Sequence, residues 1–190
     1  MTNLSAKTGT ALNAKWAIRG ALIGLMMVLY AAGATSGAAQ VTFGSPGDPP
    51  RVVIGGGAFD VIPDTKKIDH GTTGLVLGEY RFGDKLWIFS PFIGAMGTGR
   101  GAVYAYVGFG FDINFLHNLV FTPSFAGGYY ERGHGIALGS WWEFRSGAEL
   151  DYRFANDRRI GIGFYHMSNA GLAKENPGVE LATVVLTAPF

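Results

Sequence analysis

Residues 142–154 read WEFRSGAELDYRF, and this stretch indicates the fold class. Apolar or small side chains fill every second position, and the positions between them carry charges and one glycine. The even-numbered residues are Trp142, Phe144, Ser146, Ala148, Leu150, Tyr152 and Phe154, and the odd-numbered ones are Glu143, Arg145, Gly147, Glu149, Asp151 and Arg153. Because successive side chains of a β-strand point to opposite faces, this period of two predicts a strand with one apolar and one charged face.

Two kinds of β-protein can use such a strand. A soluble sandwich would turn the apolar face inward, whereas a transmembrane barrel would turn it to lipid and the charges into its lumen. Aromatic residues at both ends of the apolar face favour the barrel, because membrane proteins concentrate them at the two lipid–water interfaces. Another segment repeats the pattern, with Val103, Ala105, Val107, Phe109, Phe111, Ile113 and Phe115 on one face. The terminal Phe190, after an alternating segment, resembles the C-terminal signature of bacterial outer-membrane barrels.

Eight alternating segments can be counted along the chain. They span roughly residues 51–61, 72–82, 86–97, 102–115, 119–131, 141–155, 159–169 and 179–190. Their connections alternate between tight turns (83–85, 116–118, 156–158) and longer segments (62–71, 132–140, 170–178), with a short exception at 98–100. Short periplasmic turns and longer external loops are typical of outer-membrane barrels. The sequence therefore predicts an all-β fold, an eight-stranded antiparallel transmembrane β-barrel.

The first 39 residues are expected to form a cleavable signal peptide. Three basic residues precede an apolar stretch at 20–34, and small residues fill 35–39. This order is the secretory signal pattern. An uncleaved anchor helix is the alternative, which the short apolar stretch disfavours. Residues 40–190 then form the outer-membrane barrel that carries the functional site.

Composition narrows the remaining possibilities. A chain of 190 residues corresponds to one domain, and its net charge of +1 gives no electrostatic support for nucleic-acid binding. There is no cysteine, so disulfides and thiolate metal sites are excluded. His70, His117 and His134 lie in separate connections without ligand spacing, so neither a metal nor another cofactor is expected.

A candidate site lies at the facing ends of the last two predicted strands. His166 and Ser168 end one strand, and Glu180 begins the next across a loop. A strand places residues two apart on one face, about 6 to 7 Å between Cα atoms, and Glu180 is within cross-strand reach. An imidazole can take the proton of a serine hydroxyl while a carboxylate orients the imidazole. The pattern is compatible with a serine hydrolase, in which Asn169 and Asn176, or the backbone N–H groups around Ala170 and Gly171, are candidates to bind the oxyanion or support the site.

The parity of these strands places the candidate residues on the outer surface. The even positions of 160–168 and 180–190 are otherwise apolar or small, so the three polar residues point toward lipid at the external rim. Each residue alone is more typical of a membrane interface, and Asn176-Pro177-Gly178 alone is a turn. The residues by themselves leave a serine hydrolase open but favour a structural barrel.

The spacing of the motif adds a resemblance. His166-Met167-Ser168-Asn169-Ala170, followed by Asn176-Pro177-Gly178 and Glu180, resembles the C-terminal signature of the lipid A 3-O-deacylase (PagL) family, eight-stranded outer-membrane barrels. The motif match covers about residues 160–190, and the rest of the barrel fits by architecture. The resemblance implies Ser168 as nucleophile, His166 as general base and Glu180 as the acid that orients it. It also implies Asn176 as an oxyanion donor, and Asn169 belongs to the same motif.

The resemblance also implies a reaction and a place. The reaction is hydrolysis of the ester-linked acyl chain at position 3 of lipid A, in the outer leaflet of the bacterial outer membrane, with release of a 3-hydroxy fatty acid. Lipid A or lipopolysaccharide is then the substrate, outer-membrane lipids surround the barrel, and a homodimer is the candidate assembly. Phe164, Ile162 and Trp142 are expected to hold the acyl chain. The alternatives are a non-catalytic small barrel and a phospholipase or acyltransferase barrel.

Overall fold

The computed structural model describes residues 41–44, 47–62, 71–116 and 118–190. The predicted signal peptide, residues 1–39, lies outside the described residues. In these ranges no helix has both the length and the apolar character needed to cross a membrane. The described strands are β1 (Thr42–Phe43), β2 (Arg51–Phe59), β3 (Thr73–Arg81), β4 (Ser90–Thr98), β5 (Val103–Gly110), β6 (Ile113–Phe115), β7 (Leu119–Glu131), β8 (Trp142–Arg153), β9 (Arg159–Ser168) and β10 (Val179–Pro189).

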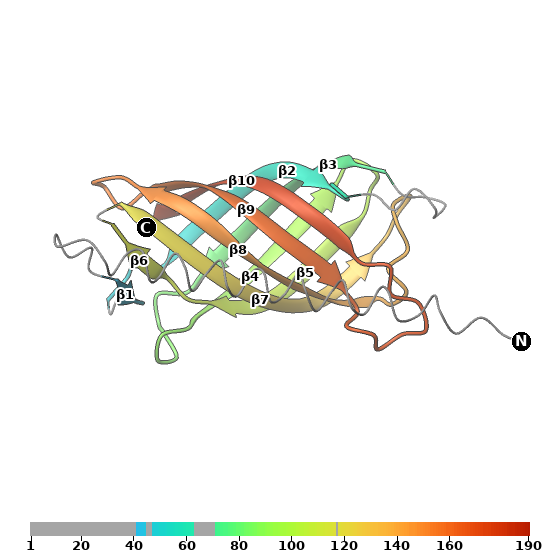
Figure 1. The fold of residues 1–190 in the computed structure, drawn as a ribbon, viewed down its shortest axis with the longest axis horizontal. Coiled ribbons are helices and arrows are strands. Elements are labelled where there is room, and N and C mark those ends of the chain that lie inside the picture. Colours follow the sequence, from blue (N-terminus) through green and yellow to red (C-terminus); the bar gives the residue numbers. More distant parts are fainter. Residues whose placement is uncertain (1–40, 45–46, 63–70, 117) are drawn as a thin grey trace, which may run out of the picture. The chain divides into compact units, whose positions relative to one another are not determined.

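The eight longer strands form a closed antiparallel barrel (Figure 1). Pairing runs from β2 through β3, β4 and β5 to β7, and onward through β8 and β9 to β10. The ring closes where β10 pairs with β2, from Leu181 opposite Phe59 to Pro189 opposite Arg51. Closure satisfies the backbone groups that an open sheet edge would expose to lipid. The predicted eight-stranded antiparallel barrel is confirmed.

One predicted strand is divided in the structure. The segment 102–115 is predicted as a single strand, but β5 ends at Gly110 and β6 begins at Ile113. Opposite the break, the Phe111 N–H donates to the Pro123 carbonyl at 3.2 Å. Proline has no N–H to return the second hydrogen bond, so the ladder is interrupted there. The Asp112 carbonyl instead accepts from the Gly44 N–H at 2.7 Å, beside β1, which pairs with β6.

A second difference concerns the start of β4, which is predicted near residue 86 and begins at Ser90. Leu86 and Phe89 exchange two backbone hydrogen bonds of 2.9 and 3.1 Å, so the chain reverses within four residues. Trp87, inside this turn, has a φ of +64°. A left-handed residue ends regular strand geometry, which explains the later start.

The alternating faces predicted from residues 142–154 are present in the barrel wall. Even-numbered apolar side chains on β8 to β10 are exposed, among them Leu150, Tyr152, Ile160, Ile162, Phe164, Val184 and Leu186. The charged odd-numbered side chains Glu143, Arg145, Glu149 and Asp151 are buried. An outer surface of this composition requires a lipid environment, because in water it would be a continuous exposed apolar patch.

The lumen is filled by a network of charged and tyrosine side chains. Nη2 of Arg145 lies 2.7 Å from Oε1 of Glu79, and Arg81 contacts both Glu79 at 2.9 Å and Glu149 at 2.6 Å. The Tyr165 hydroxyl donates to Glu149 at 2.5 Å, and the Arg145 guanidinium lies over the Tyr165 ring. Paired, hydrogen-bonded charges can remain buried, whereas an unpaired one would be costly. The interior therefore acts as a packed core that supports the wall.

The two ends of the barrel differ in their connections. The end of β6, the start of β7 and the turn at 154–158 share one end with the start of β2 and the end of β10, whereas the longer connections 132–141 and 169–178 lie at the other end. Outer-membrane barrels keep short turns at the periplasmic side. The longer connections therefore form the external rim.

Candidate active site

His166 and Glu180 lie directly opposite each other on β9 and β10 near the external rim. Nδ1 of His166 is 3.2 Å from Oε1 of Glu180. Their side chains are 48% and 27% exposed, so the pair lies on the outer surface rather than in the lumen. When the carboxylate accepts from Nδ1–H, the lone pair of the neutral imidazole is at Nε2. This arrangement leaves Nε2 available to accept a proton.

Ser168 ends β9 two residues beyond His166 and is partly exposed. Residues two apart on a strand share a face, with Cα atoms about 6.6 Å apart. Within the described residues the Ser168 hydroxyl makes no hydrogen bond, and His166 bonds only to Glu180. Hydrogen bonds between catalytic groups are often long without substrate and tighten in the substrate complex. The structure thus places serine and imidazole as neighbours that are not yet bonded.

A second serine lies beside the same imidazole. Ser146 of β8 is exposed and stands directly opposite His166 in the β8–β9 register. Directly opposite residues have Cβ atoms about 4.5–5.5 Å apart. The sequence reasoning missed Ser146 as a site neighbour, because its position depends on the exact register between two strands. Two hydroxyls are therefore candidates for contact with His166.

The His166 ring has room because residue 178 is a glycine. Gly178 has a φ of +66°, and a Cβ placed there would lie 2.7 Å from Cε1 of His166. Glycine is therefore needed both for the left-handed backbone and for the space. In the sequence, Asn176-Pro177-Gly178 indicates only a turn, and its contact with the histidine appears only in the folded chain.

Asn169 is completely buried and connects two external loops. Its Nδ2 donates to the carbonyls of Leu138 at 2.8 Å and Glu175 at 2.7 Å, and its Oδ1 accepts from the Gly171 N–H at 2.9 Å. Both amide hydrogens are thus committed to carbonyls. Of the two roles considered for Asn169, the geometry favours support over oxyanion binding.

Gly139 allows this close approach of the loops. Its φ is +92°, and a Cβ there would lie 2.0 Å from the Glu175 carbonyl oxygen. Nothing in the sequence marked Gly139 or Leu138, because their role depends on contact between loops that are far apart in the chain.

Asn176 is exposed and is held through its side-chain oxygen. Oδ1 of Asn176 accepts from the backbone N–H of Asn169 at 3.1 Å. In the described part of the chain Nδ2 of Asn176 has no partner. An amide that is oriented at its oxygen and open at its nitrogen can donate to a developing negative charge nearby.

The three residues expected to contact an acyl chain all lie on the outer surface. Phe164, Ile162 and Trp142 are 51%, 63% and 39% exposed. Phe164 stands between the small residues Ala148 and Ala182 of the neighbouring strands. Trp142 contacts the ring of Phe144, the residue directly opposite Ser168, at 6.4 Å between centroids. Apolar surface therefore adjoins Ser168 at Phe144 of β8 and begins again beyond His166, at Phe164 of β9.

Known proteins resemble the chain in sequence and in fold. The family model described as Lipid A 3-O-deacylase (PagL) matches residues 68–189. Lipid A deacylase PagL of Pseudomonas aeruginosa is 30% identical over 144 residues, which cover 63% of this chain and 83% of that protein. The crystal structure of the outer membrane enzyme PagL aligns with a TM-score of 0.58 at 20% identity, covering 74% of this chain and 99% of the other. The structural likeness supports the fold, and the match to the family model shows a relationship in sequence.

Proposed function

The chain belongs to the lipid A 3-O-deacylase (PagL) family, and on that premise we propose that it hydrolyses the ester-linked acyl chain at position 3 of lipid A. It is an outer-membrane barrel of the acyl-hydrolase class. The observation that carries the proposal is the hydrogen-bonded His166–Glu180 pair beside Ser168 on the lipid-facing surface at the external rim. A lipid substrate of the outer leaflet reaches this surface by lateral diffusion.

The reaction begins at the Ser168 hydroxyl. Nε2 of His166 takes the hydroxyl proton as the serine oxygen attacks the ester carbonyl, and Glu180 stabilises the imidazolium that forms. The side-chain amide of Asn176 donates to the oxyanion of the tetrahedral intermediate. Collapse breaks the ester C–O bond, and the sugar oxygen leaves with the proton from His166.

The second half of the reaction uses water. His166 removes a proton from a water molecule, which attacks the acyl-serine carbonyl. Collapse of this second intermediate returns the proton to the Ser168 oxygen and releases a 3-hydroxy fatty acid. The His166–Glu180 pair lies at the rim and is partly exposed, so water reaches it from outside the membrane.

The acyl chain lies against the apolar surface below Ser168. Phe164 and Ile162 continue the outward face of β9 toward the membrane centre, and Phe144, whose ring contacts Trp142, lies opposite Ser168 on β8. Ala148 and Ala182 keep the wall low on either side of Phe164, so a hydrocarbon chain can lie beside its ring. Burial of each methylene contributes about 0.8 kcal/mol.

The test is the mass of lipid A from cells that express the protein. Wild type should lower the mass of lipid A by one 3-hydroxyacyl group, and Ser168→Ala should leave the mass unchanged. Ser146→Ala is the matched control, because it also removes a serine hydroxyl next to His166, but one that belongs to β8. Intact lipid A with wild type would refute the proposed activity. If Ser168→Ala still removed the acyl group and Ser146→Ala did not, Ser146 would be the nucleophile.

Substrate class is tested with the purified wild-type protein. Lipid A and phosphatidylethanolamine are offered together, and released fatty acids are identified by mass spectrometry. The proposal predicts release of 3-hydroxy fatty acid alone. Preferential release of unsubstituted acyl chains from the phospholipid would contradict it.

A further inference from the structure

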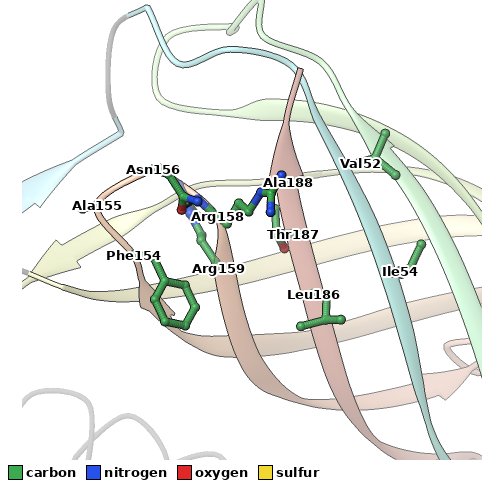
Figure 2. A pocket seen from close by; sticks show the side chains of 10 residues that line it. All are labelled: Val52, Ile54, Phe154, Ala155, Asn156, Arg158, Arg159, Leu186, Thr187 and Ala188. Carbon is green, nitrogen blue, oxygen red and sulfur yellow. Dashed lines mark hydrogen bonds between the residues drawn. The ribbon is translucent and has the colours of Figure 1, made fainter.

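An apolar hollow lies on the outer surface at the periplasmic end of the barrel. Figure 2 shows it across β10, with the β8–β9 turn on one side and Val52 and Ile54 of β2 on the other. Leu186 and Ala188 of β10 lie between these walls. Arg158, which lines this hollow, precedes His166 by eight residues. In extended geometry the two residues are about 26 Å apart along the chain. The hollow is thus separate from the candidate active site.

The size and lining of the hollow suit a lipid chain. Its volume is about 750 Å³, within the range of about 300–1,000 Å³ that is typical of ligand pockets. Its walls carry the exposed side chains of Val52, Ile54, Phe154 and Leu186. The small side chain of Ala188, opposite Val52, keeps the floor low. Apolar side chains arranged in this way can hold hydrocarbon.

The mouth of the hollow carries a cation. Two arginines, Arg158 and Arg159, line the hollow, and Arg159 is paired with Asp112 at 2.8 Å. Arg158 is exposed and has no ion pair among the described residues. Asn156 stands beside it in the same turn, with its side-chain oxygen accepting from the Arg158 N–H at 3.3 Å. An arginine next to hydrocarbon-lined surface is suited to a phosphodiester.

We propose that this hollow binds an anionic phospholipid of the inner leaflet, with the phosphate on Arg158 and an acyl chain over Ala188 and Leu186. Phe154 lies in this turn and Phe190 directly follows the end of β10, so aromatic side chains mark the headgroup level. An arginine at that depth meets phosphate, and the surface above it meets acyl chains. The inner leaflet is the source because the hollow lies at the periplasmic end. The site does not depend on Ser168 or on the proposed hydrolysis.

The experiment measures lipid retention by native mass spectrometry on the protein purified in detergent. Phosphatidylglycerol and phosphatidylcholine are titrated separately. Arg158→Gln removes the cation, and Ala188→Trp fills the floor. Arg132→Gln, an exposed arginine at the external rim, and Ala105→Trp, an exposed alanine on β5, are the matched controls. Heat-modifiable gel migration establishes that each variant forms the barrel.

Wild type and both controls should retain one phosphatidylglycerol, and Arg158→Gln and Ala188→Trp should each require about tenfold more lipid for the same occupancy. The proposal would be overturned if either test variant retained as much phosphatidylglycerol as wild type. Equal retention of phosphatidylcholine and phosphatidylglycerol by wild type would identify ordinary surrounding lipid and overturn it too. If a variant fails to fold, an excess of inorganic phosphate is added to the wild-type protein with its retained lipid. Displacement of the lipid by phosphate would show a free-anion site instead.

Discussion

Gly178→Ala is the change that most sharply probes the geometry around the proposed base. The new Cβ would lie 2.7 Å from Cε1 of His166, whereas ordinary contacts begin near 3.4 Å. The imidazole must therefore retreat by about 0.7 Å or more to restore a normal van der Waals distance. The ring is tied to Glu180 on its other side, so it cannot move without stretching or turning the 3.2 Å contact.

The size of the effect follows from that displacement. Misplacing a catalytic group by about 1 Å can cost roughly 10²-fold in rate. We expect kcat/KM to fall between about 10- and 100-fold, which corresponds to about 1.4–2.7 kcal/mol of lost transition-state stabilisation. The left-handed backbone adds about 1–2 kcal/mol of strain in the loop, too little to open a closed barrel.

Gly171→Ala is the matched control for backbone strain. Gly171 lies in the same loop with a φ of +79°, and a Cβ there would meet no atom within 4 Å. It therefore carries the same kind of strain without the contact to the ring. The assay is release of 3-hydroxy fatty acid from lipid A in mixed micelles, with heat-modifiable migration as the folding check. Equal activity losses in the two variants, or wild-type activity in Gly178→Ala, would show that contact with the His166 ring does not limit catalysis.

Three further predictions follow from contacts in the site and the lumen. Asn169→Ala removes three hydrogen bonds and leaves buried polar groups unpaired, at a cost of about 1–3 kcal/mol each. Amide hydrogen exchange should therefore accelerate in the loops 132–141 and 170–178, and unchanged exchange in both loops would contradict this. Glu180→Gln removes the charge beside His166 and should lower kcat about 10²-fold, measured with saturating lipid A; an unchanged kcat would show that the carboxylate is not needed. Arg145→Met leaves Glu79 with one fewer cation and should lower the free energy of unfolding in urea by about 3–5 kcal/mol, and a loss under about 1 kcal/mol would argue against a stabilising network.

The wall of the barrel could be predicted from the sequence because each strand carries its own signal. Alternation in residues 142–154 gives both the strand and the side that each residue faces, and a closed barrel requires the same division in every strand. This is why outward placement of His166 and Glu180 could be expected from parity alone. The break between β5 and β6 was missed, because it depends on Pro123 of a different strand.

The supporting parts of the site depend on contacts that no local pattern records. Gly178 reads as a turn glycine, and only the fold brings it against the His166 ring. Asn169 was considered as an oxyanion donor, yet its amide hydrogens are used by Leu138 and Glu175. Ser146 became a neighbour of His166 only through the β8–β9 register. The roles assigned to Ser168, His166 and Glu180 stay predictions until chemistry tests them.

The most direct measurement is covalent labelling of the proposed nucleophile. An alkyl fluorophosphonate carrying a long acyl-like chain is incubated with the purified barrel, and the modified peptide is identified by mass spectrometry. An activated serine loses its proton to His166 and displaces fluoride at phosphorus, so a stable adduct should form. We expect one adduct, on Ser168, that is also formed in Ser146→Ala and is abolished in His166→Ala. An adduct on Ser146, or labelling of Ser168 that persists in His166→Ala, would contradict it.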